Sequence, residues 1–173
     1  MLHDPALAPP KLDRITVLQG QALVSASPCE EFTTVLGSCV ATCLFDPEAR
    51  VGGMNHFLLA EPPAGKSTLG VDEHYGVFLM ELLINQMLAQ GAVKARLRAH
   101  LYGGANMRAA MAPIGSRNAE FARRFLQHER IALIREDLGG NNARRVDFRP
   151  AEGRVRCRSV APAMAPVIRP ARR

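Results

Sequence analysis

The chain contains no tryptophan and only two tyrosines, and its aromatic content is 5% over 173 residues. Proteins that bind single-stranded nucleic acid commonly stack bases on aromatic side chains, so this scarcity argues against that class. No apolar run approaches the roughly 20 residues that a membrane-spanning helix needs. The N-terminal stretch 1–15 carries acids and prolines and lacks the charged-then-apolar pattern of a signal peptide. We therefore predict a cytoplasmic protein with no membrane insertion.

Cysteine is also scarce, with four residues at irregular spacing: Cys29, Cys39, Cys43 and Cys157. A cytosolic compartment keeps such thiols reduced, so we expect no disulfide framework. On one face of a strand, Cys39 and Cys43 would lie about 13 Å apart at about 3.3 Å per residue. One zinc ion cannot bind two thiolates at that separation. We therefore predict no metal, and no other cofactor is indicated.

Positive charge is scarce in the first part of the chain. Residues 1–95 hold five Lys+Arg against ten Asp+Glu (net −5), whereas residues 96–173 hold 17 against six (net +11), and all 17 are arginine. Nucleic-acid binding would explain a basic half, but the arginines are scattered through apparent core elements and no nucleic-acid module is recognisable, so we predict no nucleic-acid partner. An Arg-rich surface also suits a carboxylate-rich protein, because guanidinium pairs bidentately with carboxylate. A compositional preference for arginine over lysine is the simpler alternative.

The order of apolar and polar segments predicts an α+β fold of layered mixed β-sheets with two main helices. An Asp-Pro turn at 46–50 folds residues 39–59 into a hairpin. We expect one catalytic domain over 14–160, between a disordered leader at 1–13 and a flexible Arg/Pro-rich tail at 161–173. Strands are predicted at 14–25 with a turn at Gly20, and at 33–36, 39–45, 51–59, 94–104, 131–137, 144–150 and 153–160.

The clearest helix is predicted at 72–91, with Asp72 as its N-cap and Gly91 as its left-handed stop. Its apolar stripe is expected to comprise Phe78, Leu79, Leu82, Leu83, Met87 and Leu88. A second helix is expected to begin at Ser116 or Asn118 and to end at about residue 128. Its buried side chains are predicted to be Phe121, Ala122, Phe125 and Leu126.

The segment around Cys39 has the features of a nucleophilic site. This cysteine follows Gly37-Ser38, where a tight turn can aim consecutive backbone N–H groups at one oxyanion. The hairpin returns His56 towards the start of the first strand, where its imidazole would act as a base and lower the thiol pKa from about 8.5. Thr33 is placed to orient the imidazole. The alternative is ordinary packing, since buried cysteine is common and His56 shares its face with apolar residues; for Cys43 packing is the preferred interpretation.

Several separated motifs resemble those of the CheD family of chemoreceptor glutamine deamidases. They are "LGSCVATCLFDPEARVGGMNHFLLA" (36–60), "LYGGANM" (101–107), "IGSRN" (114–118) and "DLGGNNARRVDF" (137–148). The resemblance covers about residues 15–160 and implies a cysteine-hydrolase-like deamidase scaffold. The "YGGANM" segment is open to two interpretations, one structural and one substrate-facing.

The resemblance also implies the activity and its residues. It places the nucleophile on Cys39, the catalytic histidine on His56 and the threonine on Thr33, with Gly37, Ser38 and Asn55 assigned to oxyanion and substrate binding. The implied reaction converts glutamine side chains of methyl-accepting chemotaxis receptors to glutamates, with release of ammonia.

Two other functions stay open at this point. The chain could be another cysteine hydrolase, such as an ester hydrolase or a peptidase, that uses the same residue pair. It could also be a non-enzymatic chemotaxis regulator, because the resemblance implies a CheC-type phosphatase as a second partner. Intact Cys39, His56 and Thr33 favour an enzyme.

Overall fold

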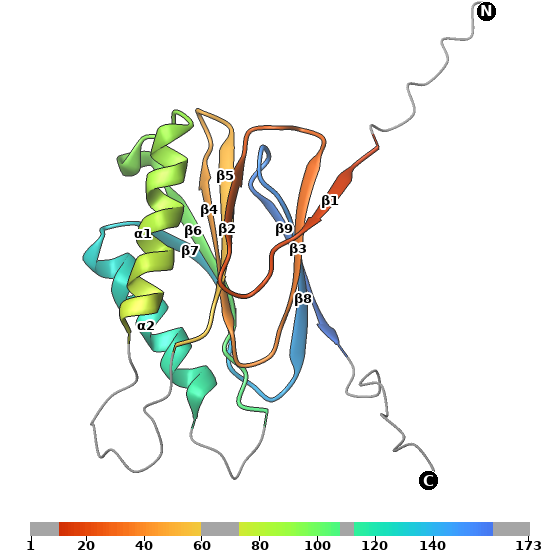
Figure 1. Cartoon of the computed structure of the whole chain (residues 1–173), viewed down its shortest axis with the longest axis vertical. Coiled ribbons are helices and arrows are strands. Elements are labelled where there is room, and N and C mark those ends of the chain that lie inside the picture. The colour runs from red at the N-terminus through yellow and green to blue at the C-terminus, as the bar shows by residue number, and fades with distance from the viewer. Residues whose placement is uncertain (1–10, 60–72, 108–112, 161–173) are drawn as a thin grey trace, which may run out of the picture.

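The computed structural model describes residues 11–59, 73–107 and 113–160. They form three layers: two helices, a five-stranded sheet and a four-stranded sheet (Figure 1). The predicted α+β fold with mixed sheets and two main helices is confirmed. The predictions for the leader up to residue 10, for Asp72 and for the tail at 161–173 lie outside the described residues.

The four-stranded sheet, called sheet A here, has the order β1-β3-β8-β9. In it β1 runs parallel to β3, and the other neighbours are antiparallel. Its strands are β1 (Asp13–Thr16), β3 (Glu30–Leu36), β8 (Ala143–Arg149) and β9 (Arg154–Val160).

The five-stranded sheet, sheet B, has the order β2-β5-β4-β6-β7 and is antiparallel except for the β6–β7 pair. The strand predicted at 14–25 is therefore divided between the two sheets, and the chain crosses between them at Gly20, whose φ is 88°. The strands of sheet B are β2 (Ala22–Ser25), β4 (Val40–Asp46), β5 (Val51–Phe57), β6 (Arg98–Gly103) and β7 (Ala132–Leu138).

The predicted hairpin over 39–59 is confirmed as the pair β4–β5. Its turn depends on Asp46, whose carboxylate accepts hydrogen bonds from the N–H groups of Glu48 (2.9 Å) and Ala49 (3.1 Å). The predicted strand at 94–104 begins late, because a short 3-10 helix, η1 (Lys94–Arg96), precedes β6.

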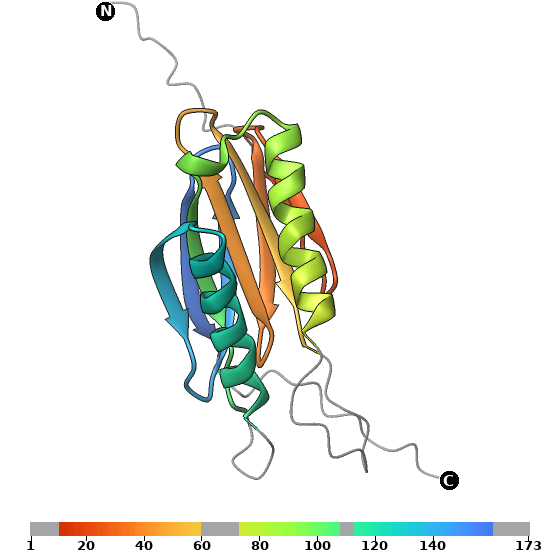
Figure 2. The ribbon, with the colours of Figure 1, turned by 90° about the vertical axis from the view of Figure 1, so that its left-hand side faces the viewer.

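Both helices cover the outer face of sheet B, and they lie next to each other there (Figure 2). Helix α1 (His74–Ala89) packs on β5 and β2, and α2 (Ile114–His128) packs on β4, β6 and β7. Gly91 has a φ of 96°, which confirms the left-handed stop after α1. The predicted stripe of α1 is partly wrong: Phe78 and Leu88 are exposed. The buried face instead comprises Gly76, Leu79, Met80, Leu83, Ile84 and Met87.

The start of α2 also differs from the prediction. The helix begins at Ile114, so Ser116 and Asn118 lie inside it and neither is its N-cap. Asn106 supplies the capping contact from outside the helix, since its Oδ1 accepts a hydrogen bond from the N–H of Ser116 at 3.2 Å. The predicted burial is confirmed for Phe121, Ala122 and Leu126, while Phe125 is only partly buried.

Buried apolar side chains form two cores. The larger lies between the helices and sheet B, and the smaller lies between the two sheets. Cys39 packs against the smaller core, together with Ala41, Cys43 and Met54. The predicted nucleophile is thus at the seam between the sheets, on the face of sheet B that the helices do not cover.

Candidate active site

A tight turn at Gly37, Ser38 and Cys39 carries the chain from β3 of sheet A to β4 of sheet B. The loop that follows β6 holds this turn through two backbone hydrogen bonds. Gly104 N–H donates to the carbonyl of Cys39 at 2.8 Å, and Ala105 N–H donates to the carbonyl of Gly37 at 2.9 Å. The "YGGANM" segment therefore supports the cysteine through its backbone.

Gly103 allows this close approach. Its φ is 106°, and a Cβ at this position would lie 2.1 Å from the carbonyl oxygen of Cys39. Arg144 holds the same loop from sheet A, because its guanidinium donates to the carbonyls of Gly103 (3.1 Å) and Gly139 (2.7 Å). No other residue type fits here without displacing the cysteine.

Asn118 of α2 is a support that the sequence did not reveal as part of the site. Its side chain is fully buried, and its Nδ2 donates to the carbonyl of Ser38 at 2.8 Å. Its Oδ1 accepts a hydrogen bond from the N–H of Leu59 at 3.1 Å. One side-chain amide thus ties the cysteine turn to the segment that follows β5.

His56 of β5 lies opposite Ala41 in the β4–β5 register, so its side chain is on the same face as Cys39, one diagonal step away. Its Nδ1 lies 2.9 Å from Oγ1 of Thr34 and 3.3 Å from the carbonyl oxygen of Val17. The Thr34 hydroxyl itself donates to the Val17 carbonyl at 2.8 Å. All these groups are satisfied when Nδ1 carries the proton, which leaves the lone pair on Nε2.

The Nε2 atom of His56 is buried and has no hydrogen-bond partner among the described residues. The thiol of Cys39 instead donates to Oε1 of Gln19 at 3.6 Å. The predicted pair is thus brought to one face of neighbouring strands without a direct hydrogen bond. Catalytic hydrogen bonds are often long or poorly aligned in enzymes without substrate.

The predicted contact between Thr33 and His56 is wrong. The Thr33 hydroxyl donates to Oδ1 of Asp147 in β8 at 2.7 Å, and the neighbouring Thr34 contacts the histidine. Successive side chains of a strand point to opposite faces, so only one of these threonines can reach the imidazole.

The structure does not bring Asn55, which was assigned to oxyanion and substrate binding, beside Cys39, because neighbouring side chains of a strand alternate in face. Its Oδ1 accepts a hydrogen bond from the N–H of Thr42 at 2.9 Å, and its Nδ2 contacts Sδ of Met80 in α1 at 3.2 Å. Asn55 therefore faces the helices, on the side of sheet B away from Cys39, and cannot bind the same substrate group. Gly37 and Ser38 form the turn before the cysteine, and their assignment to oxyanion and substrate binding stays a prediction.

Burial moves both pKa values of the pair towards the uncharged forms. It raises the pKa of the Cys39 thiol, an effect that the backbone N–H of Cys39 partly offsets, and it lowers the pKa of His56. The expected lowering of the thiol pKa by the imidazole is therefore wrong for the resting site. Before the reaction, both the thiol and the imidazole are therefore uncharged.

The other cysteines have no such setting. All four are free, and Cys43 is buried in the inter-sheet core as predicted. Cys157 lies next to Asp137, and burial together with that carboxylate raises the pKa of its thiol to about 11. Within the described residues, no cluster of histidine, cysteine and carboxylate side chains is suited to hold a metal ion.

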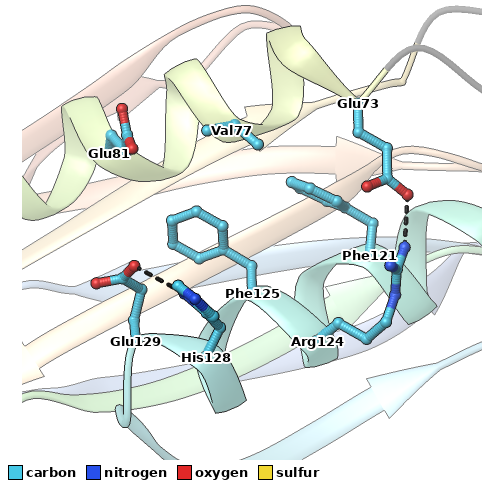
Figure 3. Close-up of a pocket in the computed structure, with 8 residues that line it drawn as sticks. All are labelled: Glu73, Val77, Glu81, Phe121, Arg124, Phe125, His128 and Glu129. Atoms are coloured by element: carbon cyan, nitrogen blue, oxygen red, sulfur yellow. Dashed lines mark hydrogen bonds and ion pairs between the residues drawn. The ribbon is translucent and has the colours of Figure 1, made fainter.

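A separate groove of about 490 Å³ lies between α1 and α2 (Figure 3). Val77, Phe121 and Phe125 contribute apolar surface, and the ion pair between Glu73 and Arg124 bridges the two helices at one end. The groove is on the helix side of sheet B, whereas Cys39 and His56 are on the other side. In the part of the chain that the structure describes, no helix has the length and apolarity to cross a membrane.

Comparison with known proteins gives a consistent result. The family model "CheD chemotactic sensory transduction" matches residues 58–159. A probable chemoreceptor glutamine deamidase CheD of Zymomonas mobilis is 59% identical over 147 residues, which are 85% of this chain and 80% of that protein. A protein with the same description from Caulobacter vibrioides is 46% identical over 158 residues, 91% of this chain and 84% of that protein.

A third such protein, from Agrobacterium fabrum, is 48% identical over 143 residues, 83% of this chain and 78% of that protein. Among solved structures, a Neisseria meningitidis protein of family DUF152 superposes with a TM-score of 0.45 and 11% identity, over 75% of this chain and 63% of that chain.

Proposed function

Because this chain belongs to the CheD family of chemoreceptor glutamine deamidases, we propose that it hydrolyses glutamine side-chain amides of chemoreceptors with Cys39 as nucleophile and His56 as general acid and base. The product of each turnover is a glutamate side chain and ammonia. No cofactor takes part in this reaction scheme.

Acylation begins with proton transfer from Sγ of Cys39 to Nε2 of His56. The sulfur then bonds to the carbonyl carbon of the substrate amide, and the carbonyl oxygen gains the negative charge. As this tetrahedral intermediate collapses, the carbon–nitrogen bond breaks and Nε2 returns its proton to the leaving ammonia. A thioester between Cys39 and the substrate side chain remains.

Deacylation uses the same two residues in reverse. Nε2 takes a proton from a water molecule, and the oxygen of that water bonds to the thioester carbon. The carbon–sulfur bond then breaks, the sulfur recovers its proton from His56, and a glutamate leaves. Backbone N–H groups of Ser38 and Cys39 are the predicted donors to the oxyanion in both steps.

The observation that carries this proposal is the state of His56. Its Nδ1 is occupied by Thr34 and Val17, and its buried Nε2 is left without a partner. An unpaired buried polar atom is costly, by about 1–3 kcal/mol, so an imidazole that served only for packing would pair both nitrogens. An open lone pair beside a thiol suits a base, and it favours an enzyme over a pure binding protein.

The finer assignments are proposals of the same kind. We place the reaction in the cytoplasm, and we keep a CheC-type phosphatase as a second expected partner. Thr34 replaces Thr33 as the residue that orients His56, because Thr34 makes the contact.

The test is conversion of glutamine to glutamate in a purified receptor cytoplasmic domain, followed by peptide mass spectrometry and by ammonia release. Cys39→Ala should abolish the conversion and keep the fold. Cys43→Ala should retain activity per folded molecule while its unfolding free energy falls by about 1–2 kcal/mol. Cys157→Ala is the matched control with unchanged chemistry. Full conversion by Cys39→Ala would end the assignment of this residue as nucleophile.

A further inference from the structure

Gln19 brings a side-chain amide to the reacting sulfur from a distant part of the sequence. It lies in the crossover between β1 and β2, and its Oε1 accepts the hydrogen bond from Sγ of Cys39 at 3.6 Å. The side chain is otherwise exposed to solvent. Of the amide side chains near the cysteine turn, Asn55 faces away and Asn118 is occupied by Ser38 and Leu59, so Gln19 alone reaches the sulfur among the described residues.

The backbone fixes where Gln19 stands. The N–H of Gln21 donates to the carbonyl of Leu18 at 3.0 Å, and the side chain of Gln21 accepts from the N–H of Leu18 at 2.9 Å. The positive φ of Gly20, 88°, is the conformation that a turn needs after Gln19 and that glycine adopts without strain. Gln19 is thus at the corner of a closed turn.

The same turn is bonded to the catalytic histidine. Gly20 N–H donates to the carbonyl of His56 at 2.8 Å, and His56 N–H donates to the carbonyl of Gln21 at 3.1 Å. The backbone of His56 is therefore bonded to the two residues that directly follow Gln19, Gly20 and Gln21.

The chemistry needs a donor at this place. The oxyanion sits on the carbon that the sulfur has bonded, and effective donors lie about 2.7–3.1 Å from that oxygen. A side-chain amide 3.6 Å from Sγ is within hydrogen-bond reach of such an oxygen. The terminal torsion of glutamine is broad, so a half-turn exchanges Oε1 for Nε2 once the thiol proton has moved to His56.

We infer that Gln19 is a further catalytic residue, whose Nε2–H donates to the substrate oxyanion beside the backbone N–H of Cys39. In the resting site its Oε1 accepts a hydrogen bond from the Cys39 thiol, and in the intermediate its Nε2 faces the negative oxygen. No bond to Gln19 is made or broken. This inference rests on the proposed attack of Cys39 on a substrate amide.

Gln19→Met tests it, because methionine keeps the length of the side chain and removes both N–H donors. We expect kcat for receptor deamidation to fall by about 100-fold or more, with KM changed far less. Alkylation of Cys39 by iodoacetamide should stay within about twofold of the wild-type rate, since displacement at a saturated carbon creates no oxyanion. Gln19→Ala should behave in the same way, and the exposed position makes both variants compatible with the fold.

Three results would overturn the inference. Wild-type or faster turnover in Gln19→Met would mean that the amide only blocks the site. A parallel fall of turnover and alkylation would mean that it positions the thiol. Absence of deamidation by the wild-type protein would remove the proposed function itself, and the inference with it, whereas an active wild type with active variants removes only the role of Gln19.

Discussion

At the scale of single residues, the site depends on a histidine that is fixed at one nitrogen and open at the other. Thr34 and the carbonyl of Val17 hold Nδ1 in its protonated form, and burial keeps the ring neutral. A neutral imidazole with a free Nε2 is ready to accept the thiol proton. In the proposed reaction, this geometry supplies a base at neutral pH without forming a thiolate beforehand.

Neighbouring threonines offer a matched pair of variants. Thr34→Val removes the contact to Nδ1, and we expect kcat/KM to fall by about 10- to 100-fold, the effect of losing 1–3 kcal/mol of orientation. Thr34→Ser should restore most of it. Thr33→Val removes the hydrogen bond to Asp147 instead, so it should lower the unfolding free energy by about 1 kcal/mol and preserve activity per folded molecule. The reverse pattern in kinetics and denaturant melts would return the orienting role to Thr33.

The pH dependence follows from the two pKa directions. Burial lowers the pKa of His56 below its ordinary 6.5, so the base form persists as the pH falls through neutrality. The kcat/KM for receptor deamidation should therefore stay level at pH 7 and decline only below pH 6.5, as the imidazole takes up a proton. Burial raises the pKa of Cys39 above that of a free thiol, so iodoacetamide alkylation should keep rising with pH beyond the range in which a free cysteine levels off. Rapid alkylation that persists at pH 6 would indicate a preformed thiolate–imidazolium pair and contradict this account.

The sequence correctly predicted that the hairpin brings His56 to the face of Cys39, but it did not predict which residues surround the two side chains. His56 and Asn55 are adjacent in a strand, so the alternation of faces could already have excluded a shared role. For Thr33 and Thr34, alternation shows only that one of them can face His56. Which one does so depends on how β3 pairs with β8, and the sequence does not reveal that pairing. Gln19 left no local signal, since only the crossing of the chain between sheets brings it to Cys39.

At the scale of elements, three segments outside the hairpin hold the cysteine turn. The loop after β6 donates two backbone hydrogen bonds to the turn, and Asn118 of helix α2 donates a third. Strand β8 acts through that loop, because its Arg144 donates to the carbonyl of Gly103. The turn is thus fixed from both sheets and from the helix layer. Small changes in any of these segments should be transmitted to Sγ.

Substitutions at two glycines with positive φ, Gly103 and Gly91, distinguish displacement of the cysteine turn from simple backbone strain. A Cβ on Gly103 would lie 2.1 Å from the carbonyl of Cys39, whereas a Cβ on Gly91 would have nothing within 4 Å. Gly91→Ala should cost about 1 kcal/mol of unfolding free energy and leave turnover unchanged. Gly103→Ala should displace the cysteine turn and reduce kcat by more than tenfold in the molecules that remain folded. Equal kinetics in the two variants would show that the loop after β6 does not position the nucleophile.

Element positions were predicted better than element faces. The hairpin, the two helices and the Gly91 stop are encoded locally by turn and stop residues. The buried face of α1 was not, because this helix is apolar on most of its surface and its periodicity fits more than one face. The start of α2 was missed because its capping group, Asn106, comes from outside the helix.

At the scale of the whole molecule, the arginines of the second half serve largely within the fold. Eight of them have carboxylate partners: Arg96, Arg123, Arg124, Arg144, Arg145, Arg149, Arg154 and Arg158. Five others form no ion pair within the described residues and are exposed: Arg98, Arg117, Arg130, Arg135 and Arg156. The number of arginines could be counted in the sequence. Which of them form ion pairs could not be predicted, because the pairing depends on the tertiary fold.

A net charge of +6 should still steer an acidic partner. We expect kcat/KM for receptor deamidation to fall as ionic strength rises, because salt screens attraction beyond about 10 Å at 0.1 M. The kcat at saturating receptor should change little. A short glutamine peptide without acidic residues is the control substrate, and its kcat/KM should not depend on salt. A flat profile for the receptor itself would show that steering is unimportant.

The distribution of the site over the chain determines when it first exists during synthesis. Cys39 and His56 lie in the first third of the polypeptide, but Gly103, Asn118 and Arg144, which hold the cysteine turn, are translated later. A nascent chain that has emerged only as far as β5 therefore carries both reactive side chains without the framework that aligns them. Domains generally fold as units once enough of the chain is available. We therefore expect the thiol of a nascent chain to stay unaligned until β8 has emerged and paired with β3 in sheet A.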